Sequence, residues 1–441
     1  MPAKEEGSAV RRLAAMLIAL LLLPCGRALA AESYALRTGG SAVLADADGH
    51  LLVSAGVYSD MIRLSDDDLF AASPVGSTQY GLVNGEGKAL TEFVYDSLVF
   101  DGETVIFSQN GMYGAMDAQG RITLEAHYTS LIFMGEGMSL ALKSDPLDDS
   151  PDALYTVMED GSEHAVGIRL SYGPFSASQG LSVAVAQGGL YGYLGADGQW
   201  AIEPAFTWAD SMALGRARVS TENGMGLIGI DGQWLIEPRA GRLVVSNSAE
   251  DAPVLSVEEN GVSLLSASDG AEIARFEGAK NAVFTGSVLC IEGANGVFLA
   301  DYSGNVLYEG GEGVESIKEL GGYMIARLDA EEEAPFVLLD ETGAEIGRWQ
   351  ELAFAGRYND VIYASFSTDD TQPTEIDGLT FRDEVSGSRR YGLIDMSGRV
   401  IIDDLTSLRA TGRALLTAET DDWLGLIRPD GTIVIRLDKE E

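Results

Sequence analysis

Two nearly identical stretches, which begin 34 residues apart, constrain the fold of this chain more than any other feature of its sequence. Tyr191–Pro204 reads YGYLGADGQWAIEP, and Met225–Pro238 reads MGLIGIDGQWLIEP. Each contains a short apolar run, an Asp-Gly pair and a second apolar run that is closed by proline. This order is typical of a β-hairpin, so the chain contains the same hairpin at least twice.

Weaker copies of this unit extend along the chain. In six copies a second glycine follows the first by six positions, and adjacent copies begin 33 or 34 residues apart. Fainter copies that start near 43, 155, 264, 298 and 338 bring the total to about eleven. A fixed period of this size is the mark of a repeat array. The repeat positions of the six clear copies are Tyr80, Gly81, Gly87, Tyr113, Gly114, Gly120, Tyr191, Gly192, Gly198, Trp200, Gly226, Gly232, Trp234, Tyr391, Gly392, Gly398, Gly425 and Gly431.

The residue types of the repeat have physical reasons. Asp-Gly, seen at Asp48, Asp160, Asp197, Asp231, Asp269 and Asp430, is expected to supply the positive φ angles of a tight hairpin turn. The first glycine is expected to permit a bulge or a close backbone approach beside the neighbouring unit. Segments between copies, such as 181–185, alternate in polarity and predict a third strand in each unit. Because a lone hairpin is marginal in water, the units must stack on each other.

The sequence therefore predicts an all-β array of about eleven antiparallel hairpin or three-strand repeats of 33–40 residues over 31–441. The clearest copies occupy 80–128, 191–240 and 391–436, and the array either closes into a propeller-like ring or stays an open solenoid. No long stretch shows helical periodicity. Irregular insertions at 144–152 and 367–390 predict exposed loops.

The N-terminus has the layout of a secretory signal. Arg11 and Arg12 precede an apolar run over 13–23, and Ala28-Leu29-Ala30 forms a small-x-small cleavage pattern. The run is too short to span a bilayer comfortably, so we expect a signal peptide over 1–30, cleaved near Ala30, and a secreted or surface-associated product. Pro24 precedes Cys25, where lipid modification requires a small residue, which argues against a lipid anchor.

The consensus aromatic-Gly-x-[Ile/Leu/Val]-x-x-x-Gly-x-[aromatic/Val]-x-Ile-x-Pro resembles that of the bacterial WG-repeat family. Tyr or Met replaces the Trp of Trp-Gly in the best copies, and divergence is heaviest over 243–390. The resemblance implies an all-β repeat array in an exported or surface-associated protein. It implies no general catalytic residues, so none are carried over to this chain.

Charge limits the choice of partner. The chain has 68 acidic and 29 basic side chains, a net charge of -39, and such a surface repels nucleic acid and anionic lipid. It favours cations or basic partners, and most of the charge is expected to be solvated surface. Beyond Cys25 the only thiol is Cys290, which lies in an apolar run and is expected to be a buried structural residue.

No familiar catalytic or metal-binding pattern emerges from the polar residues. His50, His127 and His164 lack zinc-ligand spacing, and there is no Gly-x-Ser-x-Gly elbow. We expect no metal and no cofactor. Weaker candidates for cation binding are Asp46 and Asp48, as the start of a calcium loop, and the acidic runs Asp66–Asp68 and Asp148-Asp149, as loose cation sites. Weaker candidates for catalysis are Glu203 and Glu237, as a carboxylate pair, and Ser266–Gly270, as a degenerate Asp box. Trp200 and Trp234 are candidate stacking platforms for a ligand. For the runs Asp66–Asp68 and Asp148-Asp149 a solvated acidic loop is the simpler interpretation, and for the others it is a structural role.

The function that fits these observations is an exported, non-catalytic scaffold. It would present an acidic surface and inter-repeat loops, including those near Asp148 and Asp377, to a protein, peptide or glycan. We expect no nucleic-acid partner, no membrane span after signal removal, and a monomer. Two alternatives remain open: a propeller-like carbohydrate-active enzyme that uses Asp/Glu acid–base pairs, and a structural surface spacer.

Overall fold

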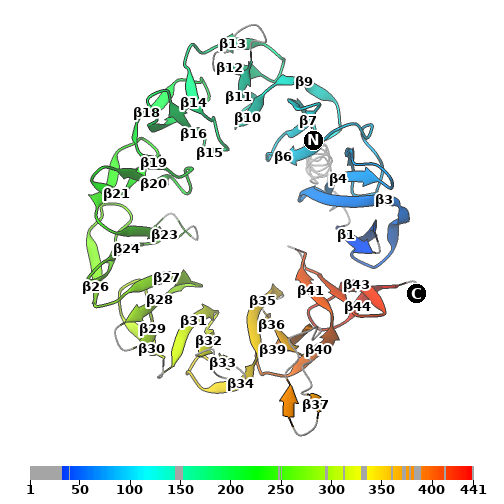
Figure 1. The fold of residues 1–441 in the computed structure, drawn as a ribbon, viewed down its shortest axis with the longest axis vertical. Helices are drawn as coiled ribbons and strands as arrows, with labels where there is room; N and C mark the ends of the chain where they lie inside the picture. The colour runs from blue at the N-terminus through cyan, green and yellow to red at the C-terminus, as the bar shows by residue number, and fades with distance from the viewer. Residues whose placement is uncertain are drawn as a thin grey trace, which may run out of the picture.

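The computed structural model describes residues 32–439 except 39, 145–151, 247–248, 250, 294–295, 311–312, 329–334, 359–360, 370–373, 377–378, 382–388 and 412–413. All regular structure in this described part is β-strand, which confirms the all-β prediction. Ten small antiparallel sheets of four or five strands lie side by side in a ring (Figure 1). The fold is therefore a ten-bladed β-propeller, and the open solenoid is excluded.

The strands of the first five sheets are β1 (Ser33–Thr38), β2 (Ser41–Asp46), β3 (Leu51–Ser65), β4 (Leu69–Pro74) and β5 (Gly81–Val83); β6 (Ser97–Phe100), β7 (Val105–Gln109), β8 (Met112–Met116) and β9 (Ile122–Tyr128); β10 (Ser130–Gly135), β11 (Met138–Lys143), β12 (Ala153–Met158) and β13 (Glu163–Ala165); β14 (Leu170–Tyr172), β15 (Ala177–Ser178), β16 (Leu181–Ala186), β17 (Tyr191–Leu194) and β18 (Trp200–Phe206); and β19 (Trp208–Ala209), β20 (Arg216–Thr221), β21 (Gly224–Gly229) and β22 (Trp234–Arg239).

The second five sheets contain β23 (Arg242–Val245), β24 (Val254–Glu258), β25 (Gly261–Leu265) and β26 (Glu272–Glu277); β27 (Asn281–Thr285), β28 (Val288–Gly293), β29 (Gly296–Ala300) and β30 (Val306–Glu309); β31 (Val314–Leu320), β32 (Tyr323–Leu328), β33 (Phe336–Leu339) and β34 (Glu345–Trp349); β35 (Glu351–Tyr358), β36 (Val361–Asp369), β39 (Arg389–Asp395) and β40 (Val400–Leu405); and β41 (Ser407–Ala410), β42 (Leu416–Glu419), β43 (Trp423–Ile427) and β44 (Ile433–Asp438). A small separate hairpin pairs β37 (Thr374–Ile376) with β38 (Leu379–Phe381).

Each blade is a meander of consecutive strands. In the blades after the first, the first strand faces the centre of the ring and the last strand faces outward, as β23 and β26 show in Figure 1. The repeat hairpin of the sequence forms the third and fourth strands, for example β17 with β18 and β21 with β22. The predicted third strand of the unit is the one before them, such as β16 or β20. The sequence did not indicate the fourth, innermost strand.

The first blade combines two sequence units, which is why the sheets number ten and the predicted repeats about eleven. β3 is 15 residues long; its first half pairs with β2 and its second half pairs with β4. Elsewhere a break separates the outermost strand of one unit from the innermost strand of the next, as at Thr129 between β9 and β10. In the first blade the outermost strand of the first unit and the innermost strand of the second unit are continuous as β3, so one sheet contains the copies at Val43 and Tyr80.

Hydrophobic packing follows the sequence units. The described residues form eleven buried clusters, and each one lies between two successive units. One cluster joins the two ends of the chain, since Leu36 and Val43 of the first unit pack with Leu426 and Ile435 of the last. Burial of apolar faces between neighbours is the main stabilising term in such an array, and here it also closes the ring.

The second glycine of the repeat shows the same closure. In the turn between the third and fourth strands this glycine lies against the outer strand of the preceding unit: a Cβ on Gly232 would lie 3.1 Å from Ile202. Gly49 of the first unit meets the last unit in the same way, because its Cβ would lie 2.3 Å from the Val434 carbonyl oxygen. The two ends of the chain therefore meet through the contact that joins the internal units.

The turn itself differs from the prediction. Gly195 and Gln199 pair across the turn, with the Gly195 N–H donating to the Gln199 carbonyl at 2.9 Å, and only Gly198 has a positive φ, of 75°. This is a three-residue loop with the glycine in the left-handed region. The aspartate of Asp-Gly does not adopt positive φ; instead Asp197 Oδ1 accepts the Gln199 N–H at 3.0 Å, so its role is to bind the backbone.

The first glycine behaves as the sequence predicted, with one change. The ladder shifts register at this position between Tyr191 and Tyr193, which is a bulge. A Cβ on Gly192 would lie 2.7 Å from the Ile202 carbonyl oxygen, so the backbone does approach closely. The approaching backbone, however, belongs to the outer strand of the same blade and not to the neighbouring unit.

The predictions on loops and termini concern segments of which the structure describes only a part. The two ends of the insertion 367–390 belong to strands β36 and β39, and the hairpin β37–β38 lies between them. The other residues of this insertion, Asp377 included, lie outside the described part of the chain, and so do Asp148 and Asp149 of the first insertion. The signal-like segment and Cys25 also lie outside it. Across the described residues, no helix has the length and apolar character required to cross a membrane.

Candidate functional site

The inner and outer walls of the ring differ in charge. Among the residues whose side chains are described, the innermost strands carry Asp60, Glu315, Glu319 and Glu351 against Arg63, Arg242, Lys318 and Arg409, so they are close to neutral. Exposed apolar side chains such as Val99, Trp208 and Val283 lie on the same strands. The outermost strands carry mainly carboxylates, for example Glu203 on β18 and Glu237 on β22. The acidity of the chain is therefore concentrated away from the inner wall.

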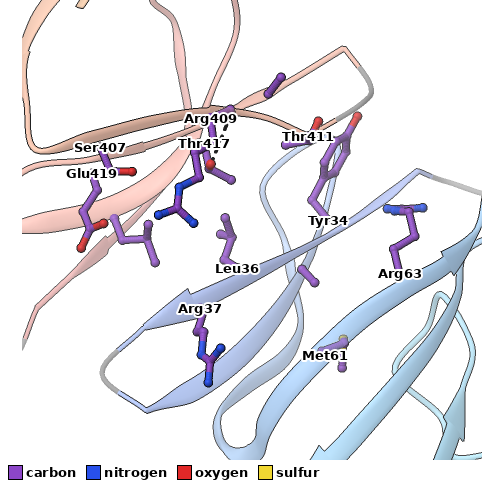
Figure 2. Close-up of a pocket in the computed structure, with 13 residues that line it drawn as sticks. Tyr34, Leu36, Arg37, Met61, Arg63, Ser407, Arg409, Thr411, Thr417 and Glu419 are labelled. Carbon is purple, nitrogen blue, oxygen red and sulfur yellow. Dashed lines mark hydrogen bonds between the residues drawn. The ribbon is translucent and has the colours of Figure 1, made fainter. Parts of the chain in front are cut away.

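The ring departs from its repeat at the junction of the first and last units, where a pocket lies (Figure 2). The first unit begins at β1, which corresponds to the second strand of the other units, so the described chain supplies no innermost strand there. A pocket of about 480 Å³ lies beside β1. We name it the junction pocket; its walls include Tyr34, Leu36 and Arg37 of β1, Met61 and Arg63 of β3, Ser407 and Arg409 of β41, Thr417 and Glu419 of β42 and Leu424 of β43.

One of the three arginines in the junction pocket has a structural role. Arg63 forms an ion pair with Asp68, donates to the Ser33 carbonyl and lies over the Phe70 ring, 4.9 Å from its centroid. Asp68 is 3% exposed and also accepts the Ser33 N–H at 3.1 Å. These contacts fix the start of β1 against β3. The sequence analysis treated Asp66–Asp68 as one solvated acidic run; Asp66 and Asp67 are exposed, but Asp68 is a buried anchor.

The other two arginines keep their charge available. The Arg37 side chain is 71% exposed, and its Nη1 lies 3.8 Å from Asp60 Oδ1, beyond hydrogen-bond distance. Arg409 is exposed, and no described residue forms an ion pair with it. The acidic groups nearby have other partners: Tyr80 donates to Asp60 at 3.2 Å, and Lys439 pairs with Glu419 at 2.9 Å. Burial, and then the bond to Asp60, raises the pKa of the Tyr80 hydroxyl.

The candidate histidines are dispersed. His50 Nδ1 lies 2.9 Å from Asp46 Oδ2, and this hydrogen bond raises the pKa of the His50 imidazole. Asp46 also accepts the Asp48 and His50 N–H groups, so its carboxylate organises the turn. His164 lies on β13. Within the described ranges, no three His, Cys, Asp or Glu side chains are grouped so that they could hold a metal ion.

His127 belongs to a polar cluster with Glu163 at its centre. His127 Nε2 lies 3.2 Å from Glu163 Oε1, Tyr128 donates to that oxygen at 2.6 Å, and Lys143 Nζ lies 2.5 Å from the other oxygen. Burial alone would raise the pKa of Glu163, but the donors from Lys143, Tyr128 and His127 outweigh it and lower the pKa to about 2. Burial, with the bond to Glu163, raises the pKa of Tyr128. The cluster connects two neighbouring blades through β9, β11 and β13.

The other sequence candidates have identifiable places. Trp200 and Trp234 are half-buried and pack against successive interface clusters, and Trp234 meets Phe206 edge-on at 6.0 Å between ring centroids. Glu203 and Glu237 are exposed at equivalent positions on different blades. Cys290 is buried, as predicted, and burial raises the pKa of its thiol. Of the repeat tyrosines, Tyr80, Tyr191 and Tyr391 pack at interfaces, whereas Tyr113 is 37% exposed.

The junction pocket escaped the sequence analysis because none of its basic residues belongs to the repeat. One signal was present in the sequence. The copy at Val43 begins so close to the expected cleavage point at Ala30 that only one strand fits between them. If residues 1–30 are removed, this spacing leaves room for one strand fewer than in the other units, and a missing strand exposes a sheet edge.

Comparisons with known proteins give one family match and several similar solved structures. The WG containing repeat matches residues 191–224, which span the hairpin β17–β18 and the start of the next unit. A search of curated proteins finds no match. Similar solved structures include a eukaryotic initiation factor (10% identity over 63% of this chain and 84% of that chain, TM-score 0.41) and PorZ, a surface component of the type-IX secretion system of Porphyromonas gingivalis (9% identity over 91% and 73%, TM-score 0.27). BamB from Moraxella catarrhalis is similar at 10% identity over 67% and 93%, with a TM-score of 0.24. The family match covers one unit of the ring, so the identity that it shows is a similarity of this unit to the WG containing repeat.

Proposed function

We propose that this protein is an exported, non-catalytic scaffold that binds a protein, peptide or glycan. The observation that carries the proposal is the uniform packing of the units, end to end, into a closed ring. A ring held by the same contact at each interface is a rigid support, and rigid supports suit loops and strand edges that bind partners. The ligand would meet the acidic outer surface and the inter-repeat loops, or the nearly neutral inner wall.

The acidic groups support binding rather than turnover. Asp117 Oδ1 accepts the Gln119 and Arg121 N–H groups at 2.9 Å, and Asp301 and Asp340 bind their own turns in the same way. These carboxylates repeat around the ring and are occupied by the backbone. An acidic outer surface disfavours nucleic acid, so the partners proposed for this outer surface carry basic or neutral polar groups. The protein is proposed to act as a monomer.

Export predicts a shortened protein. We expect the chain recovered from the producing cell to begin at Ala31, because the small-x-small pattern ends at Ala30 and the basic and apolar segments precede it. Intact mass measurement and N-terminal sequencing of the purified protein test this. Protein that remains in the cytosol with residues 1–30 attached would contradict export.

Binding without turnover is the second expected result. Peptide and glycan arrays probed with labelled full-length chain should show saturable binding, and polysaccharide substrates incubated with the same protein should remain intact. Blank arrays with a normally folded protein would favour a structural spacer. Turnover that disappears on substitution of a single Asp or Glu would show an enzyme and would overturn the non-catalytic assignment.

A further inference from the structure

We propose that the junction pocket binds an extended peptide with acidic side chains, which adds to the first blade as the innermost strand that its own described chain lacks. This proposal deepens the scaffold function and rests on it. The observation behind it is topological. β1 pairs with β2 on one side, and in the described residues no strand pairs with its other side.

The main chain of β1 supplies the first part of the recognition. In the later units an innermost strand covers the corresponding edge: β6 covers β7, and β41 covers β42. The open edge of β1 presents N–H and C=O groups at alternate residues, and an added strand would pair with them. Addition of a strand to an exposed sheet edge is an established way in which proteins bind peptides. An extended chain satisfies this edge, whereas a sugar does not.

The pocket supplies the second part of the recognition. Innermost strands elsewhere place one apolar side chain into the interface with a neighbouring unit, such as Leu98, Leu243 or Ile317. The junction pocket has apolar walls at the matching place, from Leu36 of the first unit and Leu424 of the last. We therefore expect the middle of the bound peptide to be aliphatic, with its side chain directed between these walls.

Charge selects the residues on either side of that position. Arg37 and Arg409 lie on opposite walls of the pocket, on β1 and β41, and both are exposed (Figure 2). Arg409 has no ion pair with the described residues, and Arg37 has only the distant Asp60. Both guanidinium groups are therefore available to a ligand. Carboxylates are their natural partners, because a guanidinium binds a carboxylate through two parallel hydrogen bonds.

The chain contains a suitable probe. Residues 95–103 read YDSLVFDGE and contain the innermost strand β6 (Ser97–Phe100), with aliphatic Leu98 and Val99 in the strand and Asp96 and Asp101 immediately on either side of it. A fluorescent synthetic peptide of this sequence has the shape that the open edge requires. We expect it to bind the full-length chain saturably in a fluorescence polarisation titration. A peptide with both aspartates replaced by lysine should bind at least tenfold more weakly.

Two variants and one modified peptide separate this site from others. Arg409→Glu should weaken binding of the probe at least tenfold, whereas Arg242→Glu, the same change on inner strand β23, should leave binding unchanged. A probe with alternate backbone N-methyl groups keeps the side chains but loses the edge hydrogen bonds, and it should not bind. This peptide tests the proposal even if a variant fails to fold.

The outcomes distinguish this proposal from the scaffold function. Absence of saturable probe binding to the full-length chain would overturn the proposed site, and so would equal weakening by Arg409→Glu and Arg242→Glu or undiminished binding of the N-methylated probe. If the peptide and glycan arrays still showed binding, the scaffold function would stand without this site. Blank arrays together with a failed probe would remove both.

Discussion

Substitution of Gly192 by alanine is expected to destabilise the protein by about 2–3 kcal/mol, although it adds one methyl group. The new Cβ would lie 2.7 Å from the Ile202 carbonyl oxygen and 2.9 Å from the Pro204 nitrogen. Both atoms belong to the backbone of β18, so no side chain can rotate away and the strand itself must move. Urea unfolding followed by circular dichroism gives the change in the free energy of unfolding.

Gly188 provides the control, four residues earlier in the same blade. A Cβ there would meet nothing within 4 Å, and Gly188 is not among the glycines with positive φ. Gly188→Ala should therefore change stability by less than about 0.5 kcal/mol, or stabilise slightly through the unfolded chain. Equal effects of the two substitutions would show that the close approach of β17 and β18 does not determine the repeat glycine.

The repeat determined much of what the sequence could predict. Its spacing placed the hairpins, since Tyr191–Leu194 and Trp200–Phe206 are strands where the pattern indicated them. It also gave the role of Gly192 and the packing of Trp234. Local patterns of this kind are visible in a sequence because turn chemistry and alternation act over a few residues.

Features that depend on contacts between distant residues were not predictable. Nothing near Gly49 indicates that it meets Val434, and nothing near Asp68 indicates that Arg63 and Ser33 bind it. The choice between ring and solenoid depends on a small rotation per unit that accumulates over the whole array. The junction pocket follows from that closure together with a first unit whose described residues begin at its second strand, so it could be described only once the positions of the first and last units were known.

Leu426→Ala should destabilise the protein by about 3 kcal/mol, as should Leu227→Ala. The two leucines follow the repeat glycine in Leu424-Gly425-Leu426 and Met225-Gly226-Leu227, and both are 0% exposed. Leu227 packs at an internal interface of the ring, and Leu426 packs between the last unit and the first. Because the residue type, the burial and the repeat position of the two leucines match, a difference between the losses of unfolding free energy in the two variants reports on the difference between the two interfaces.

Comparable losses of unfolding free energy for the two variants in urea unfolding would mean that the interface between the last and first units is as stable as an internal interface. If the junction opens readily, Leu426 is already exposed in part of the native population, and its truncation then costs much less than that of Leu227. A cost for Leu426→Ala below about 1 kcal/mol, beside the full cost for Leu227→Ala, would contradict a closed ring. Such a result would also remove the rigid junction pocket, because its two sides belong to the first units and to the last, and only closure brings Arg37 and Arg409 together.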